Sequence, residues 1–365
     1  MFESKVGFQF FADAGTLVNA TGNYVNAGTG QTTAFSGNDT LAPTMKTFYD
    51  TQLLENARPE LVHAQFAGKQ ALPRNHGKTV EWRKWNTLED ASELTEGVIP
   101  TGQKLGQSSM TASISQIGTY VSVSDQLELH ALDNVILGAT EELGASAGTS
   151  IDKRVRDAIS GGNNVQYCDK VSSAGAHTEV TGRSGLDTTA KLTPTEVNKA
   201  VTTLKKLKAP RINGKYVAII HPSVAYDLRE SDGWIEAHKY AATTELFSGE
   251  IGELHGVRFV ETTEAKVFND STCPVKTAAD TSNQKPATYY SVYSTLFLGK
   301  DAYKMIDPEG GNLQMIVKAK SEIGGPLDQF STIGYKAEMA TKLVYEDRMV
   351  RVESCSAYSA TDAAN

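Results

Sequence analysis

The strongest candidate for catalytic chemistry in the sequence is a histidine that stands two residues before a serine. His221, Pro222 and Ser223 could supply a base and a nucleophile. The G-x-S-x-G turn that exposes a catalytic serine is absent from the sequence, and a histidine before a proline is typical of a turn or a core position. We therefore expect no enzyme activity. A cytosolic hydrolase that uses His221 and a carboxylate is kept only as a remote alternative.

Metal and phosphate sites have even less support. Glu253 and His255 lack the HExxH spacing that places two imidazoles on one helical face. The Gly28-Thr29-Gly30 run neither follows a strand nor opens a helix, and no GxxxxGK[ST] motif occurs. Three cysteines lie far apart and form no metal-binding pattern: Cys168, Cys273 and Cys355. We predict no cofactor and no metal.

Composition indicates a globular protein that folds in a reducing, cytosolic environment. The chain has 365 residues, of which 40% are hydrophobic and 21% are charged, and a formal net charge of -8. A dedicated nucleic-acid binder normally carries a basic surface, so DNA is expected at most as a neighbour. The first residues make a poor signal peptide, and no stretch approaches the roughly 18 apolar residues that span a bilayer. We expect no membrane partner.

Residues 14–44 are rich in Gly, Asn, Thr and Ala and carry almost no charge. They show neither a helical nor a strand period, which predicts an extended arm. A disordered tail is the alternative. Apolar residues such as Tyr24 and Phe35 are spread through the segment, and they favour an arm that lies on a neighbouring surface. Two short helical patterns follow from Met45, and Pro59 suits the first position of the second one.

Residues 77–85 alternate as a strand, with Val80, Trp82 and Lys84 opposite Glu81, Arg83 and Trp85. Its expected partner is the strand pattern at residues 110–125. The polar segment between them is too long for the interior of a compact domain, so we predict a projecting hairpin. Its base is basic and its tip acidic. The candidate contact residues are Arg74, Lys78, Trp82, Arg83, Lys84, Trp85, Glu89, Asp90, Glu93 and Glu96.

A long helix is predicted over about residues 126–160. Asp125 and Glu128 have the spacing of a capping box, and apolar residues then recur every three or four positions. At about 1.5 Å per residue such a helix spans about 50 Å. Three glycines weaken it or admit another backbone: Gly138, Gly144 and Gly148.

The rest of the chain has a mixed order of helices and strands. A second capping box, Thr193 to Glu196, opens a helix that ends near Pro210. A buried strand is predicted at residues 215–222, a short helix at 223–230, and strands at 249–265, 289–299, 312–320 and 340–352. This order indicates an α+β fold and not the βαβ rhythm of a doubly wound sheet.

Taken in order, these segments resemble the major capsid proteins of tailed phages with the HK97-like fold, in the coat-protein branch of certain short-tailed phages. The resemblance covers most of the chain from about Tyr49. It rests on the collinear order of several motifs: ARPELVHAQFA (57–67), GKTVEWRKW (77–85), TEGVIP (95–100), IGTYVSVSD (117–125), YVAIIHPSVAYDLR (216–229), GEIGELHGVRFVET (249–262) and GPLDQFSTIGYKAEMATKLVYEDRMVRVES (325–354).

The resemblance implies a division of the chain into parts. These are an N-terminal arm (1–44), short helices (45–67), an extended loop (68–123), a spine helix with a peripheral domain (124–209), an axial domain (210–288), and strands that return to the peripheral domain with a C-terminal tail (289–365). It implies an icosahedral shell around double-stranded DNA, built from hexamers and pentamers of the chain, with scaffolding, portal or decoration proteins as open further partners. The expected location is the virion, after assembly in the host cytoplasm.

We expect the extended loop to lie across an adjacent subunit, with Trp82 and Trp85 packing at its base. The alternative is a solvated loop whose tryptophans pack within their own subunit. Within the same fold, an encapsulin-type nanocompartment shell that encloses enzymes is the alternative function. The long Gly/Asn-rich arm and the TEGVIP motif favour the viral branch.

Overall fold

The computed structural model describes most of the chain from Val62 onward and two short segments before it. The described residues are 23–25, 32–34, 62–73, 77–86, 88–91, 93, 96–97, 99, 102–130, 135–172, 175–231, 233–235, 250–277, 288–308, 313–318 and 329–365. Two compact units divide the chain. One comprises Met1–Asn56, Val121–Glu141 and Val317–Ile333, and the other comprises Ala57–Tyr120, Glu142–Ile316 and Gly334–Asn365.

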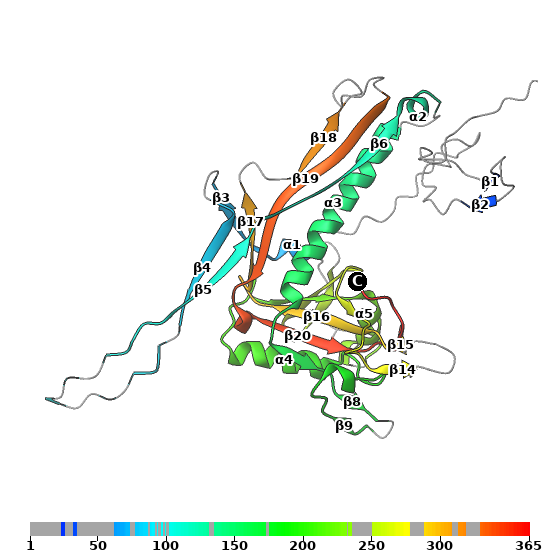
Figure 1. Cartoon of the computed structure of the whole chain (residues 1–365). Coiled ribbons are helices and arrows are strands. Elements are labelled where there is room, and N and C mark those ends of the chain that lie inside the picture. The colour runs from blue at the N-terminus through cyan, green and yellow to red at the C-terminus, as the bar shows by residue number, and fades with distance from the viewer. Residues whose placement is uncertain are drawn as a thin grey trace, which may run out of the picture. The chain divides into compact units, whose positions relative to one another are not determined.

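A seven-stranded mixed sheet forms the centre of the second unit (Figure 1). Its strands, in spatial order, are β11 (Glu250–Leu254), β12 (Val257–Glu261), β10 (Tyr216–Ile220), β16 (Val292–Leu298), β20 (Met349–Ser354) and β7 (Val165–Tyr167), with β13 (Val267–Phe268) paired to β16. Every residue of β10, β16 and β20 is buried. The apolar run at residues 215–222 therefore marks a strand covered on both faces.

The two faces of this sheet belong to two different cores. On one face, Tyr216, Ala218 and Ile220 pack with the helices α4 (Pro194–Lys206) and α5 (Pro222–Arg229). On the other face, Val217 and Ile219 pack with the C-terminal end of the helix α3 (Val135–Ser160). Alternate residues of one strand thus bind helices on opposite sides, as the pleat requires. The expected α+β class is confirmed.

The second sheet has five strands. They are β18 (Gln314–Lys318), β19 (Phe330–Leu343), β17 (Tyr303–Pro308) and β3 (Gly68–Leu72) in this order, with β6 (Ser115–Ser124) paired to β19. β17 runs antiparallel to β19 and parallel to β3. The chain after residue 289 therefore supplies strands to both sheets.

The hairpin is present, but its second strand is shorter than the sequence indicated. β4 (Thr79–Trp85) pairs with β5 (Gln107–Ser113), from Thr79 opposite Ser113 to Trp85 opposite Gln107. The expected partner at residues 110–125 is two strands, because the chain leaves the hairpin at buried Ile114, whose amide donates to the Lys78 carbonyl at 2.9 Å. β6 then joins the five-stranded sheet.

The long helical pattern corresponds to α2 (Asp125–His130) and α3, and residues 131–134 lie outside the described part. The expected apolar stripe is confirmed in the second unit, where Leu143, Ala147, Val155 and Ile159 are buried. Its start differs from the expected capping box. Ser124 Oγ accepts from the Leu127 amide at 3.4 Å, and the Asp125 carboxylate accepts from the Gln126 amide at 2.8 Å.

A second capping box was predicted at α4, and it is wrong in part. Thr193 is the N-cap residue and Pro194 begins the helix, but the Thr193 side chain makes no capping hydrogen bond. Glu196 does not reach back to it, because its buried carboxylate binds Gln166 at 2.9 Å and Lys199 at 2.8 Å. The Glu196 side chain thus binds Gln166 and Lys199 in place of the backbone amide of Thr193.

The strand expected at residues 340–352 is also two strands in two sheets. β19 ends at Leu343, the 3₁₀ turn η3 (Glu346–Arg348) follows, and β20 begins at Met349. The interruption allows the chain to pass from the five-stranded sheet to the seven-stranded one. Alternation continues across it, so the sequence pattern alone did not reveal the break.

The remaining elements are short. They are β1 (Asn23–Val25) paired with β2 (Thr32–Ala34), the helix α1 (Val62–Gln65), β8 (Lys170–Val171) paired with β9 (His177–Thr178), the 3₁₀ turn η2 (Arg183–Gly185), and β14 (Val275–Thr277) paired with β15 (Thr288–Tyr289). The arm thus contains paired strands too short to give a sequence period. The helical pattern from Met45 lies outside the described residues. None of the described helices is long and apolar enough to span a membrane.

Candidate assembly interface

The base of the hairpin is built into the second unit. Trp82 is 5% exposed and packs with Ile114, Ile306 and Ala340, and its indole nitrogen donates a 2.6 Å hydrogen bond to Gln70 Oε1 on β3. Trp85, three residues later and on the other face of β4, is 60% exposed. The two faces predicted for residues 77–85 are thus confirmed: Val80, Trp82 and Lys84 are covered more than their neighbours.

Two basic residues of the hairpin base, Lys84 and Arg83, have ion-pair partners within the chain, whereas the acidic residues of the tip have none among the described residues. Lys84 Nζ lies 2.9 Å from the Asp347 carboxylate, and Arg83 Nε lies 3.4 Å from that of Glu81. Lys78 is exposed, and Arg74 lies outside the described residues. All four tip carboxylates are exposed, namely those of Glu89, Asp90, Glu93 and Glu96. The tip is therefore a free acidic surface.

Sequence reasoning missed the apolar side chains of the same loop. Leu88 is 52% exposed, Ile99 is 94% exposed and Leu105 is 60% exposed. Large aliphatic residues inside a polar, Gly-containing loop were the available signal. Together with Trp85 they form what we call the apolar tip set. Such side chains are stabilised only when another surface covers them.

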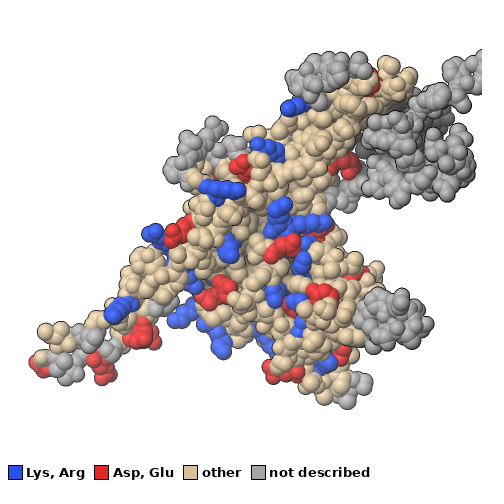
Figure 2. Space-filling view, in the orientation of Figure 1, with Lys and Arg blue, Asp and Glu red and all other residues tan. Residues whose placement is uncertain are grey.

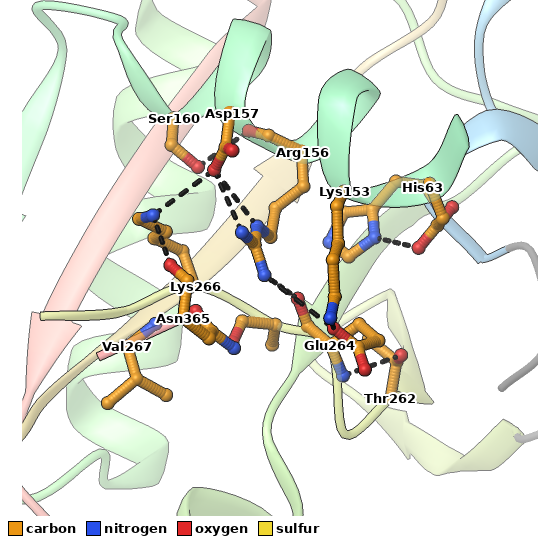
Figure 3. Close-up of polar contacts among 12 residues, drawn as sticks. His63, Lys153, Arg156, Asp157, Ser160, Thr262, Glu264, Lys266, Val267 and Asn365 are labelled. Carbon is orange, nitrogen blue, oxygen red and sulfur yellow. Dashed lines mark hydrogen bonds and ion pairs between the residues drawn. The ribbon is translucent and has the colours of Figure 1, made fainter. Parts of the chain in front are cut away.

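A polar cluster joins α3 to the segment between β12 and β13 (Figure 3). Arg156 is 2% exposed, and its guanidinium donates to the Glu264 carbonyl and to the Asp157 carboxylate, both at 3.0 Å. Lys153 lies 3.2 Å from the Glu264 carboxylate, and Lys266 lies 3.2 Å from that of Asp157. These bonds fix the helix relative to the central sheet within the second unit.

The same helix holds the segment that leads into the hairpin. Asp152 Oδ1 accepts from the amides of His63 and Ala64 at 2.8 and 3.2 Å, and Oδ2 lies 2.6 Å from His63 Nδ1. Tyr303 donates its hydroxyl to the His63 carbonyl. His63 is fully buried. A carboxylate on α3 therefore satisfies the free N-terminal amides of α1, which has too few residues to be stable alone.

The side chains that suggested catalysis do not form a nucleophile and base pair. His221 Nδ1 accepts from the backbone amide of Ser223 at 3.2 Å, as the N-cap of α5, and Ser223 Oγ lies 3.4 Å from Asp362. Burial raises the pKa of Cys355 to about 12, and burial likewise raises the pKa of Cys168 and Cys273, so all three thiols stay protonated. Within the described residues no group of three metal-binding side chains comes together. His221 and Ser223 thus form part of the start of α5 and are not arranged as a base and a nucleophile.

Comparison with known proteins agrees with these features. The model of the phage capsid protein family matches residues 13–306. No curated protein sequence matches the chain. The structure is similar to the capsid of Ralstonia phage GP4, which is 13% identical, with a TM-score of 0.60 over 88% of this chain and 97% of that one.

Two further solved structures show the same fold. The capsid protein of cyanophage P-SCSP1u is 15% identical and gives a TM-score of 0.57 over 86% of this chain and 93% of that one. That of Helicobacter pylori bacteriophage KHP30 is 9% identical and gives a TM-score of 0.60 over 88% and 99%. The chain therefore belongs to the phage capsid protein family, and it is a structural major capsid protein with the HK97-like fold.

Proposed function

We propose that copies of this chain assemble, as hexamers and pentamers, into the icosahedral shell that encloses the double-stranded DNA of a tailed phage. The observation that carries the proposal is the hairpin: its base is buried within its own chain, and its apolar tip set is exposed, with Ile99 at 94%. Assembly would take place in the host cytoplasm and would place the chain in the virion. The net charge of -8 suits a wall beside DNA that it does not bind tightly.

The extended loop, in this proposal, lies across an adjacent copy. Its four tip carboxylates and its apolar tip set would supply charge and contact area. The same chain has a polar hollow of about 970 Å³ beside α3, and Lys153 and Arg154 are among its lining residues. Opposite charges on the tip and on this lining favour the hollow as the acceptor on the next copy.

Deletion of residues 89–106 tests the loop contact. The deletion joins Leu88 to Gln107, which leaves three residues between β4 and β5, a length that hairpins accept. We expect a folded chain that elutes as a small species in size-exclusion chromatography, while the wild type forms shells visible by electron microscopy. Intact shells from the deletion variant would contradict the loop contact.

The contents of purified wild-type shells test the enclosing role. DNA inside particles supports the phage shell, whereas enclosed enzymes without nucleic acid would support the nanocompartment alternative. A wild-type chain that stays a small oligomer and hydrolyses substrates would overturn both. The family match favours the first outcome.

A further inference from the structure

The C-terminal end of α4 carries an exposed leucine surrounded by cations. Leu207 is 41% exposed. Four exposed cations lie within four residues of it, and we call this set the basic patch: Lys205, Lys206, Lys208 and Arg211. None of the four has an ion-pair partner within the described part of the chain, and Arg211 stacks on the ring of Tyr216 at 5.6 Å. Figure 2 shows Lys and Arg side chains gathered over this end of α4. An apolar centre with a polar rim is the usual anatomy of a protein interface.

A hollow of about 690 Å³ lies beside the same helix and has the complementary character. Its apolar wall includes Val165, Tyr167 and Val350. Its lining carries three carboxylates against one ammonium, that of Lys199, which binds Asp169 at 2.5 Å and Glu196 at 2.8 Å. The third carboxylate, on Glu179, is exposed and has no cation beside it among the described residues. We call this site the acidic hollow.

The basic patch lies beyond the acidic hollow, toward the C-terminal end of α4. Glu196, Lys199 and Thr203 line the hollow, and their spacing of three and four residues places them on one side of the helix. Lys206 and Leu207 follow Thr203 by three and four residues and continue the hollow's side of the helix, whereas Lys205 does not. Lys205 follows Thr203 by two residues, which is about 200° around the axis. Lys205 therefore points away from the hollow of its own chain. A head-to-tail contact that closes a ring joins two different surfaces of the same chain, and this chain carries two such surfaces.

We propose that the basic patch of one copy docks in the acidic hollow of the next copy, with Leu207 against the apolar wall and Lys205 facing Glu179. A basic patch alone would also suit the phosphates of DNA. The exposed leucine at its centre and the matched hollow on the same chain favour a second copy as the occupant. This inference rests on the proposed function, because it concerns contacts between assembled copies.

A charge-reversal cycle in the full chain tests the contact. Lys205→Glu and Glu179→Lys should each lower the yield of shells about tenfold, because each places like charges opposite one another. The double variant should restore most of the yield, since the pair is then complementary again. Lys205→Arg is the matched control and should assemble as the wild type does. Equal thermal unfolding temperatures of the unassembled variants would show that the fold is intact.

An independent variant tests the apolar part. Leu207→Ser should also lower the shell yield, although it changes no charge. Wild-type yield from both single reversals, or a double variant no better than the singles, would overturn the proposal. Lys205→Glu shells that form in wild-type yield but hold less DNA would also overturn the proposal, because they would show that the basic patch binds DNA phosphates and not a second copy. If the wild type formed no shells, the proposed function would fail, and self-association of the same variants in sedimentation experiments would still decide whether the two surfaces dock.

Discussion

The indole nitrogen of Trp82 donates a 2.6 Å hydrogen bond to Oε1 of Gln70, so β4 is joined to β3 through side chains as well as through packing. Three residues further on, Trp85 has no such cover and is 60% exposed. The two tryptophans separate two roles of the hairpin. The first anchors the loop in its own chain, and the second is available to another surface.

Alanine substitutions should separate these roles. Trp82→Ala removes a buried aromatic side chain and should lower the free energy of unfolding by about 3–5 kcal/mol. Trp85→Ala should change it by less than about 0.5 kcal/mol, as exposed positions do, yet should reduce shell assembly. Urea unfolding of the unassembled chains and particle yield measure the two effects. Equal loss of stability in both variants would contradict this division.

The contact between Asp152 and α1 gives a second prediction. Asp152→Ala leaves the amides of His63 and Ala64 and the buried imidazole without their acceptor, and should cost about 3–5 kcal/mol in unfolding free energy. Asp152→Asn retains an oxygen for the amides and should cost less. Glu142→Ala, at an exposed position of α3, is the control and should have little effect. Denaturant titrations measure the free energies of unfolding of the three variants. An unchanged free energy in Asp152→Ala would show that the Asp152 carboxylate is not needed to hold α1.

Some elements of the fold could be predicted from the periodicity of apolar and polar residues within one segment. The alternation at residues 77–85 gave the buried and exposed faces of β4, because a half-buried strand repeats every two residues. The apolar run at 215–222 gave β10. Neither pattern depends on which strand comes next to it.

What the sequence did not reveal depends on partners far away in the chain. The division of residues 110–125 occurs at Ile114, where a backbone bond to Lys78 ends one strand pairing before another begins. The acidic hollow is lined from β7, from residues 179–181 and from α4, which no local pattern connects. The apolar residues of the tip set can be seen in the composition of the loop. The sequence alone does not show whether such residues are exposed or lie in a core, whereas the structure does.

Two glycines permit β6 and β19 to lie side by side, and they give a third prediction. A β-carbon at Gly118 would lie 2.5 Å from the Tyr335 carbonyl oxygen, and one at Gly334 would lie 2.7 Å from the Tyr120 β-carbon. Alanine at either position should lower the free energy of unfolding by about 1–3 kcal/mol through overpacking.

Gly144 of α3 is the matched control for these substitutions. A β-carbon there would meet nothing within 4 Å. Gly144→Ala should raise the free energy of unfolding by roughly 0.5–1 kcal/mol, because alanine favours the helix. Thermal unfolding compares the three variants, and destabilisation by Gly144→Ala in the unassembled chain would contradict the open space beside it.

His221 predicts a pH dependence of stability. Burial lowers the pKa of His221 below its ordinary value of 6.5, although the charges of Asp362 and Glu264 oppose the change, and its ring lies 4.9 Å from that of Tyr293. The folded chain thus binds a proton at His221 less readily than the unfolded chain does. Stability from this group is present above about pH 6.5 and decreases as the pH falls through and below this value.

His221→Asn separates this effect from that of the other histidines. Asparagine is a good N-cap and can accept from the Ser223 amide without titrating, so the variant should lose less stability than the wild type between about pH 7.5 and 5.5. His255→Asn is the control, because His255 is exposed and its positive φ of 51° is one that asparagine tolerates. Urea unfolding across this range should give parallel curves for the wild type and His255→Asn. If the His221→Asn curve ran parallel to them as well, the buried imidazole would not be the group that senses acid.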